Sequence, residues 1–322
     1  MKIIKSLIAV AALATSVAGA SQYPDKAVRI VVPYPAGGGV DFVARTVAQR
    51  LGVIWGQAVT IENKSGASGS IGADSVAKSK ADGLTLLLAS PAEVMVGPIA
   101  GQKTPYDPIK SFTPIILAGE TPLGIVAHPT VQGSNLNDLI VANKRSRLNL
   151  AYGTPGSGSS MQFAGEAFSQ GTGIALHHIP YRGAAPVVND VLGNQVPLGI
   201  VGLPPLVAHV KAGKLKLLAV TTTKRSATLP DTPAVSELPG MQDYRFSNWM
   251  LLLAPANTPA NVINKIAADV AIILQEPETR KRLEEGGVDP MGLHGTELAR
   301  FMTEERNRYT GLAKARNIKF SE

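Results

Sequence analysis

The chain has 322 residues, 45% of them hydrophobic and 17% charged, which is typical of a soluble globular protein with one large domain or two of ordinary size. It contains no cysteine, which excludes disulfides, thiol catalysis and cysteine-ligated zinc. The net charge is +7, but the basic residues are scattered without an aromatic-rich stripe, so the sequence argues against nucleic-acid binding and predicts a weak attraction for small anions.

Residues 1–20 have the pattern of a secretory signal peptide. Lys2 and Lys5 precede an apolar stretch at residues 7–17, and the small residues 18–20 form a cleavage site. The apolar stretch is too short for a membrane span, and no cysteine follows it for a lipid anchor. We therefore expect an exported, periplasmic protein that starts near residue 21.

Residues 28–45 read VRIVVPYPAGGGVDFVAR and predict a strand, a glycine loop and a helix. The β-branched run at residues 28–32 ends in two prolines, residues 37–39 are glycines, and Asp41 is expected to cap the helix. Glycines leave backbone amides uncovered, and a helix start adds a partial positive charge. The motif predicts an anion seat, and the alternative is a tight turn that binds nothing.

The same pattern recurs twice in the first third of the chain. A strand at residues 59–62 runs into a Gly/Ser loop at residues 65–72. An apolar run at residues 84–89, typical of a buried parallel strand, ends at residues 90–93. Because the carboxyl ends of parallel strands share one edge of a sheet, we expect these loops to meet the loop at residues 35–41.

The second half repeats the arrangement. A strand at residues 148–152 feeds a glycine-rich loop at residues 153–160 and a helix. Two apolar runs, at residues 123–127 and 249–254, predict strands that cross between two lobes. Small-molecule sites are usually found in clefts between lobes, and the two glycine loops would face each other there.

The two crossings predict a discontinuous first lobe that encloses a continuous second one. The expected boundaries are residues 1–20 for the signal peptide, 21–123 plus 250–322 for lobe 1, and 124–249 for lobe 2. Each lobe is expected to be a doubly wound α/β sheet flanked by helices.

Other segments carry no site signature. Residues 101–114 are rich in proline and predict an irregular surface connection. Amphipathic helices are expected at residues 261–274, 278–285 and 296–315, packed on the first lobe.

Several segments in order carry a family resemblance: VVPYPAGGGVDFVAR, NKSGASGSIG, YGTPGSGSS, HIPYRGAAP, DVLGNQV, AGKLKLLAVTTTKRSATLPDTPAVSE and NWMLLLAPANTP. Together they resemble the Bug-type (TctC-like) substrate-binding receptors of tripartite tricarboxylate transporters, over essentially all of the mature chain. The resemblance implies a two-lobed periplasmic binding protein of the Venus-flytrap, type II-like fold. Such a protein captures a small carboxylate and delivers it to a membrane permease, and we expect a monomer without catalysis, cofactor or metal.

The resemblance places a carboxylate seat on the first glycine loop and the Gly/Ser loop, and further contacts on the second lobe. The loops themselves add neighbouring positions. The candidate ligand-binding residues are Tyr34, Pro35, Ala36, Gly37, Gly38, Gly39, Asp41, Gly66, Ala67, Ser68, Gly69, Ser90, Glu93, Gly153, Thr154, Ser157, Tyr181 and Asp190.

Four positions at or near the expected cleft depart from the family pattern. Ser65 stands where proline is usual, Met161-Gln162 where histidine is frequent, residues 90–93 where small polar residues are common, and Met250-Leu251 where an aromatic–glycine pair is usual. The identity of the ligand is therefore the property that the resemblance transfers least.

Three charged residues have two interpretations each. Glu93, if it faces the cleft, would repel anions unless the carboxylate ligand also carries a hydrogen-bond donor; the alternative is that it points to solvent. Arg182 is either an arginine clamp or a solvated surface residue. Asp41 is either a helix cap alone or also a ligand contact through water.

The alternatives to a transport receptor are a hydrolase and a sensory co-receptor. A hydrolase is disfavoured because the five histidines show no HExxH spacing, no G-x-S-x-G elbow exists, and residues 66–72 lack the Lys-Ser/Thr of a phosphate loop. A sensory co-receptor would use the same lobe closure on its ligand, so the sequence does not separate it from a transport receptor.

Overall fold

The computed structural model describes residues 23–133, 135–146, 150–315 and 318. The predicted signal peptide lies outside this part of the chain. Within it, ten strands form one sheet with a main path β2-β1-β3-β9-β4-β7-β5-β6, and β8 and β10 pair with β4. None of the helices described here combines the length and hydrophobicity that a bilayer span requires.

The first lobe starts with the three predicted βα units. Strands β1 (Val28–Val32), β2 (Val59–Asn63) and β3 (Thr85–Ala89) are parallel, with β1 in the middle. Helices α1 (Gly39–Trp55) and α2 (Ser70–Ala77) follow the first two strands. The three loops after the strands leave from one edge, as the sequence predicts, because parallel strands end on the same side.

The expectation that residues 90–93 form a loop is wrong, because the segment after β3 is largely helical. It turns directly into a π-helix, η2 (Ala92–Val96), which continues as α3 (Gly97–Ile99). A single 3-10 turn, η1 (Ala67–Gly69), precedes α2.

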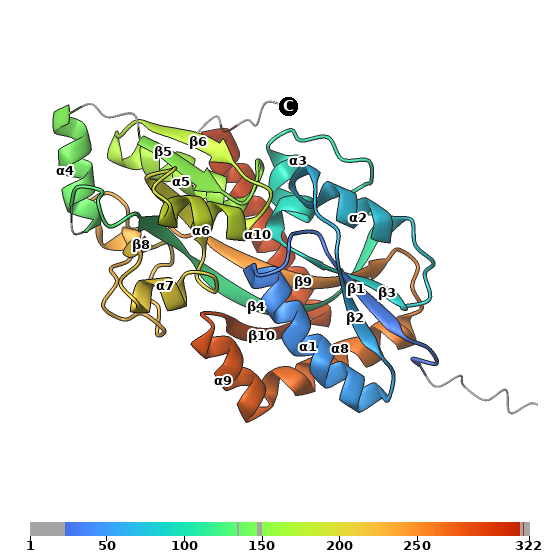
Figure 1. Ribbon diagram of the computed structural model, residues 1–322. Helices are drawn as coiled ribbons and strands as arrows, with labels where there is room; N and C mark the ends of the chain where they lie inside the picture. Colours follow the sequence, from blue (N-terminus) through green and yellow to red (C-terminus); the bar gives the residue numbers. More distant parts are fainter. Residues whose placement is uncertain (1–22, 134, 147–149, 316–317, 319–322) are drawn as a thin grey trace, which may run out of the picture.

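Strand β4 (Phe112–Ala127) belongs to both halves of the sheet (Figure 1). It pairs antiparallel with β9 (Ser247–Pro255) up to Pro122↔Ser247, and then with β7 (Leu198–Gly202) and β8 (Lys216–Val220). The expectation of an irregular connection up to residue 114 is wrong at its end, because β4 begins at residue 112. Register shifts around residues 114–119 hide the alternation that normally marks a strand.

The second lobe is built on β7, β8, and the parallel pair β5 (Leu150–Thr154) and β6 (Leu176–Pro180). Helices α5 (Ser160–Thr172) and α6 (Ala184–Leu192) follow β5 and β6. The remaining helical elements of this lobe are α4 (Leu136–Ser146), α7 (Val207–Lys211) and η3 (Val235–Glu237).

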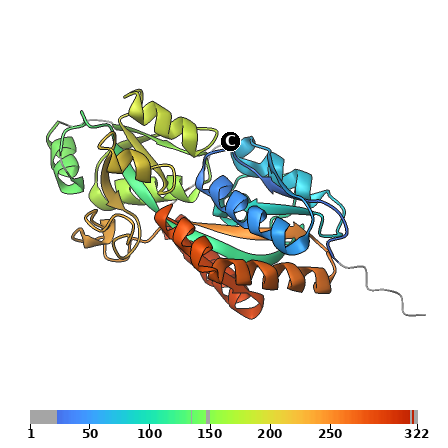
Figure 2. The ribbon, with the colours of Figure 1, turned by 60° about the horizontal axis from the view of Figure 1, so that its bottom comes forward.

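Figures 1 and 2 show the two lobes joined by β4 and β9. The largest buried cluster is continuous across this junction, from Val31 and Leu87 in one lobe through Trp249 to Tyr152 and Phe163 in the other. The junction is therefore a packed core. The predicted lobe boundaries at residues 123 and 249 stay a prediction.

The C-terminal region contains α8 (Ala260–Gln275), α9 (Pro277–Glu285), the unpredicted strand β10 (Asp289–His294) and α10 (Gly295–Ala315). Helix α8 packs on α1 and β4, as expected for the first lobe, and α9 packs on α8 and β10.

Helix α10 has a wider role than the sequence predicts. It packs on β4 and β10, but its Tyr309 also lies edge-on against Phe163 of α5, with ring centroids 5.5 Å apart. Trp249 of β9 donates a hydrogen bond to its Glu305, 3.2 Å away. Helix α10 therefore reaches from the first lobe to the second.

Candidate ligand-binding site

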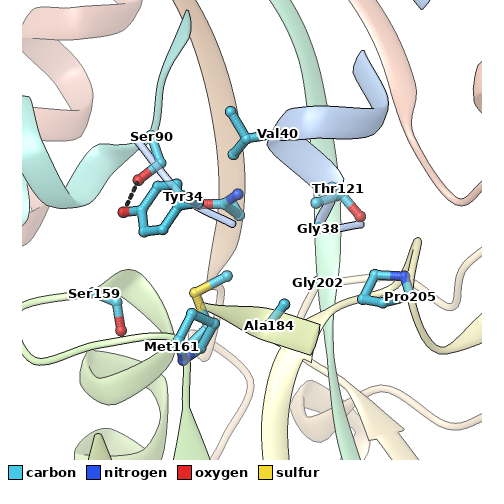
Figure 3. Close-up of a pocket in the computed structure, with 13 residues that line it drawn as sticks. Tyr34, Gly38, Val40, Ser90, Thr121, Ser159, Met161, Ala184, Gly202 and Pro205 are labelled. Carbon is cyan, nitrogen blue, oxygen red and sulfur yellow. Dashed lines mark hydrogen bonds between the residues drawn. The ribbon is translucent and has the colours of Figure 1, made fainter. Parts of the chain in front are cut away.

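A cavity of about 40 Å³ lies where loops of both lobes meet the crossing strands β4 and β9. Figure 3 shows Tyr34, Gly38, Val40 and Ser90 of the first lobe facing Ser159, Met161 and Ala184 of the second. Its wall is formed by Tyr34, Gly38, Gly39, Val40, Ser90, Thr121, Pro155, Ser159, Met161, Ala184, Gly202, Pro205 and Asn248.

A second, outer cavity of about 170 Å³ shares Tyr34 and Pro155 with the first. It lies between the Gly/Ser loop of the first lobe and the loops after β5 and β6. Its wall is formed by Pro33, Tyr34, Ser65, Gly66, Ala67, Ser68, Gly69, Pro155, Gly156, Ser157, Pro180, Tyr181 and Arg182.

The lobes touch directly around these cavities. Gly183 has φ +125°, and a methyl group there would lie 2.7 Å from Cδ of Pro35 in the opposite lobe. A methyl group on Gly39 would lie 3.3 Å from Cγ of Pro204, so this contact is also tight. The glycine loops at residues 37–39 and 153–160 line the same cavity, as the sequence predicts.

The first-lobe loop is held by Asp41, but not in the predicted way. Helix α1 has Gly38 as its N-cap, so the expectation that Asp41 caps the helix is wrong. Asp41 lies in the first turn, and its carboxylate accepts hydrogen bonds from Gly37 N (3.0 Å), Arg45 Nε (2.9 Å) and Asn63 Nδ2 (2.9 Å). Gly38 adopts the extended backbone of a cap, so the helix begins before Asp41.

The hydrogen bonds of Asp41 lower its pKa by more than burial raises it. Burial raises the pKa of this carboxyl, but the bonds from Arg45, Gly37 N and Asn63 bring it below the usual 3.8. Asp41 is thus ionised and neutralised by Arg45. Gly38, Gly39 and Val40, at the start of α1, line the cavity, and the first amides of a helix have no intrahelical acceptor.

Glu93 neither points to solvent nor lines the cavity, so both predicted orientations are wrong. It is 1% exposed, because η2 turns it inward, and its Oε2 accepts hydrogen bonds from Ser90 N (3.0 Å) and Ser90 Oγ (2.8 Å). Among the described residues, no partner bonds its Oε1. Burial raises the pKa of Glu93 to about 7.

Ser90 connects the Glu93 carboxyl to the cavity wall. The Ser90 hydroxyl lies 3.0 Å from the Tyr34 hydroxyl, and both residues are in the cavity wall (Figure 3).

The second-lobe loop is held by neutral side chains. Ser159 caps α5: its Oγ accepts a hydrogen bond from Gln162 N (3.2 Å) and donates to the Gly156 carbonyl (2.7 Å). Gly158 N donates to Gln162 Oε1 at 2.9 Å. Ser159 and Met161 at the start of α5, and Ala184 at the start of α6, also line the cavity.

The buried Thr154 hydroxyl lies 2.6 Å from Nε2 of His178. Burial, with a contribution from His177, lowers the pKa of His178 to about 4, so this imidazole is neutral near pH 7.

The crossing strands contribute two residues that sequence reasoning missed, Thr121 of β4 and its ladder partner Asn248 of β9. Thr121 Oγ1 donates a hydrogen bond to the Gly287 carbonyl, 2.6 Å away. Nothing local marks either residue, because their position follows from the pairing of strands 127 residues apart. The full set of wall residues outside the candidate list is Val40, Thr121, Pro155, Ser159, Met161, Ala184, Gly202, Pro205 and Asn248.

The candidate residues fall into three groups. Those in the inner wall are Tyr34, Gly38, Gly39 and Ser90. Those in the outer wall are Tyr34, Gly66, Ala67, Ser68, Gly69, Ser157 and Tyr181. The third group lies in or beside the loops but lines neither of these two cavities in the part of the chain that the structure describes. Its members are Pro35, Ala36, Gly37, Asp41, Glu93, Gly153, Thr154 and Asp190.

The outer wall also contains the exposed Arg182 and Ser65. Tyr181 of this wall donates a hydrogen bond to Asp190, 2.8 Å away. Burial, and then this hydrogen bond, raise the pKa of Tyr181 to about 12. Of the positions that depart from the family pattern, Met161 lines the inner cavity, whereas Met250 and Leu251 are buried in the cores away from it. Within the described residues, no group of three His, Asp or Glu side chains is placed to hold a metal ion.

Comparison with known proteins gives one consistent result. The family model described as "Tripartite tricarboxylate transporter family receptor" (TctC) matches residues 43–318. Protein BugT of Bordetella pertussis is 32% identical over 320 residues, which is 99% of this chain and 98% of the relative.

Two solved structures from Rhodopseudomonas palustris are similar and contain ligands. One, with adipate, is 32% identical with a TM-score of 0.89, and the match covers 92% of this chain and 99% of that one. The other, MatC with bound malate, is 26% identical with a TM-score of 0.83, covering 90% and 99%.

Proposed function

The chain belongs to the tripartite tricarboxylate transporter receptor (TctC) family, and from that membership we propose that it is an extracytoplasmic receptor that captures a small carboxylate between its lobes and delivers it to a membrane permease. The similar structures with adipate and malate support the ligand class.

The observation that carries the proposal is the meeting of three helix N-termini. Helices α1, α5 and α6 begin at Gly39, Ser160 and Ala184, and residues of each first turn or cap line the cavity. Amides at a helix start donate charge-assisted hydrogen bonds to a carboxylate, and the helix dipoles add to the attraction.

The wall suits a receptor that must release its ligand. Among the described residues that line the inner cavity there is no Arg, Lys, His, Asp or Glu. A carboxylate is thus held by amides supplied from both lobes, and opening the lobes removes half of them at once.

The candidate residues have different proposed roles. The amides around Gly38 and Gly39 contact the ligand, and Tyr34 and Ser90, whose hydroxyls bond to each other, form the wall beside it. Residues of the outer wall, including Arg182, form the mouth through which the ligand passes. The carboxylate of Asp41 holds the loop and does not touch the ligand.

The proposal extends to the whole chain. Residues 1–20 are removed on export to the periplasm, lobe 1 comprises residues 21–123 and 250–322, and lobe 2 comprises residues 124–249. The mature protein is a monomer without catalytic activity.

Thermal-shift screening tests the proposal. The refolded mature protein, freed of copurified ligand, is screened against about a hundred anions, because a molecule bound to the native state raises the apparent stability. We expect a shift with one class of carboxylates. Shifts only with phosphates or nucleotides, or turnover of any compound, would contradict the receptor function.

A backbone substitution localises the binding. Ser160→Pro removes one amide at the start of α5, where proline is tolerated because the preceding Ser159 is extended. We expect carboxylate affinity to fall about tenfold or more, the loss of one charge-assisted hydrogen bond. Ala260→Pro makes the same change at the start of α8, which lies outside the cavity, and should leave affinity unchanged.

A further inference from the structure

We infer that Asn248 recognises a neutral group that both donates and accepts hydrogen bonds, so that the ligand is a short monocarboxylate with a hydroxyl or amide at its far end. This rests on the proposed function, because it takes the inner cavity as the ligand site. It goes further by assigning the chemistry of the end that lies against the crossing strands.

Asn248 lies where the crossing strands meet the cavity. It lies on β9 one residue from the last β4–β9 pair, opposite Thr121, and both residues line the cavity. Asn248 is 5% exposed, so its carboxamide is shielded from bulk solvent. Side chains at the junction of the lobes are held by the ladder, so Asn248 presents the same group to every ligand.

The carboxamide of Asn248 has no hydrogen-bond partner among the described residues. In the described part of the chain, no side-chain hydrogen bond involves Asn248. The side-chain atoms that are sealed from solvent without a partner belong to Asp74, Glu93 and Tyr309. The amide of Asn248 is therefore open to the cavity that it lines.

The other polar side chains of the wall already have hydrogen-bond partners within the protein. Tyr34 and Ser90 bond to each other, and Ser90 also donates to Glu93. Ser159 donates to the Gly156 carbonyl and accepts from Gln162 N, and Thr121 donates to the Gly287 carbonyl. Among the described wall residues, Asn248 thus carries the side-chain donor that no protein acceptor has taken.

The chemistry of a carboxamide selects the ligand group. Nδ2 donates and Oδ1 accepts, and leaving either without a partner on a buried side chain weakens binding. A second carboxylate satisfies only Nδ2, and it would be buried beside Oδ1 in a wall without a cation. An ammonium group satisfies only Oδ1. A hydroxyl or an amide can satisfy both.

The test is calorimetric titration of the refolded, full mature protein with four probes of the same chain length. These are butanoate, 4-hydroxybutanoate, succinamate and succinate. We expect 4-hydroxybutanoate or succinamate to bind at least about tenfold more tightly than both butanoate and succinate, because a polar site rejects an analogue that leaves it unpaired. The tighter of the two identifies the group as a hydroxyl or an amide.

Variants assign the preference to Asn248. Asn248→Leu, similar in size, should bring the affinity of the preferred polar probe down to that of butanoate. Asn248→Asp keeps the size but adds a negative charge, and should weaken all four probes. The matched control Asn261→Leu changes an exposed asparagine of α8 and should retain the wild-type preference.

Butanoate or succinate binding as tightly as the polar probes would overturn the inference, as would a preference that survives in Asn248→Leu. In either case the receptor function stands if carboxylates bind. If no carboxylate of the anion screen binds, the proposed function fails first and the inference fails with it.

Discussion

The loop after β1 and the loop after β5 each connect a strand to a helix whose first residues line the cavity, but different chemistry holds the two loops in place. The first-lobe side contains two buried carboxylates, Asp41 and Glu93. The second-lobe loop is held by Ser159 and Gln162, which are neutral.

The two carboxylates of the first lobe also differ from each other. Arg45, Asn63 and a backbone amide bond to Asp41, and its pKa is lowered. The Glu93 carboxyl accepts hydrogen bonds from Ser90, but burial is the larger effect and raises its pKa to about 7. The comparison shows that partners, rather than burial alone, decide the charge of a buried acid. It also predicts that the contribution of Glu93 to stability depends on pH, whereas the contributions of Ser159 and Gln162 do not.

The largest expected effect is that of Glu93→Gln on the pH dependence of stability. The folded pKa of about 7 lies above the usual 4.5, so the folded wild type holds a proton that the unfolded chain has lost, and its stability falls as pH rises through 7. The total loss is about 3 kcal/mol from the difference in pKa. Gln cannot ionise, so the variant should lack this fall.

Urea denaturation at about pH 5 and about pH 8.5 measures the slope. Glu278→Gln, on an exposed side chain of α9, is the matched control and should keep the wild-type slope. Parallel profiles for wild type and Glu93→Gln would contradict the predicted charge of Glu93.

Asp41→Ala should have the next largest effect. It leaves Gly37 N without its acceptor and Asn63 Nδ2 with the Tyr34 carbonyl alone, and should lower the free energy of unfolding by about 2 kcal/mol near neutral pH. Because the pKa of Asp41 is lowered, this contribution is present above pH 4 and is lost as pH falls through the folded pKa.

Denaturation at neutral and acid pH checks the sign. Asp243→Ala, at an exposed loop position, is the control. A loss that persists undiminished in acid would mean that Asp41 stabilises the loop by packing and not by charge.

Ser159→Ala should cost about 1 kcal/mol, the usual loss for a helix cap. The effect should be the same at every pH, because none of the groups that Ser159 bonds titrates. Ser159→Thr keeps an acceptor and should restore most of the stability. A pH-dependent loss would contradict the neutral character assigned to this side of the cavity.

Arg45→Met should have the smallest effect, about 0.5 kcal/mol, because its guanidinium is half exposed and screened by solvent. Asp41 keeps its bonds to Gly37 N and Asn63. A denaturation midpoint shifted as far as that of Asp41→Ala would show that the ion pair, and not the two hydrogen bonds, holds the loop.

Much of the architecture could be predicted from the sequence because its signals are local. Continuous apolar runs mark buried parallel strands, and glycines before an amphipathic stretch mark loops that end in a helix start. These signals predicted the α/β class, the three βα units of the first lobe and the facing glycine loops. They placed Tyr34, Gly38, Gly39 and Ser90 at the site.

The tertiary structure decided the features that depend on pairing between distant residues. Strand β4 begins at residue 112 because β9 supplies its partner, and the same pairing brings Thr121 and Asn248 into the cavity. The π-helix η2 turns Glu93 into the core, and α10 reaches Phe163 across the junction. No local pattern carries this information, since a side chain's surroundings are set by packing against segments far away in the chain.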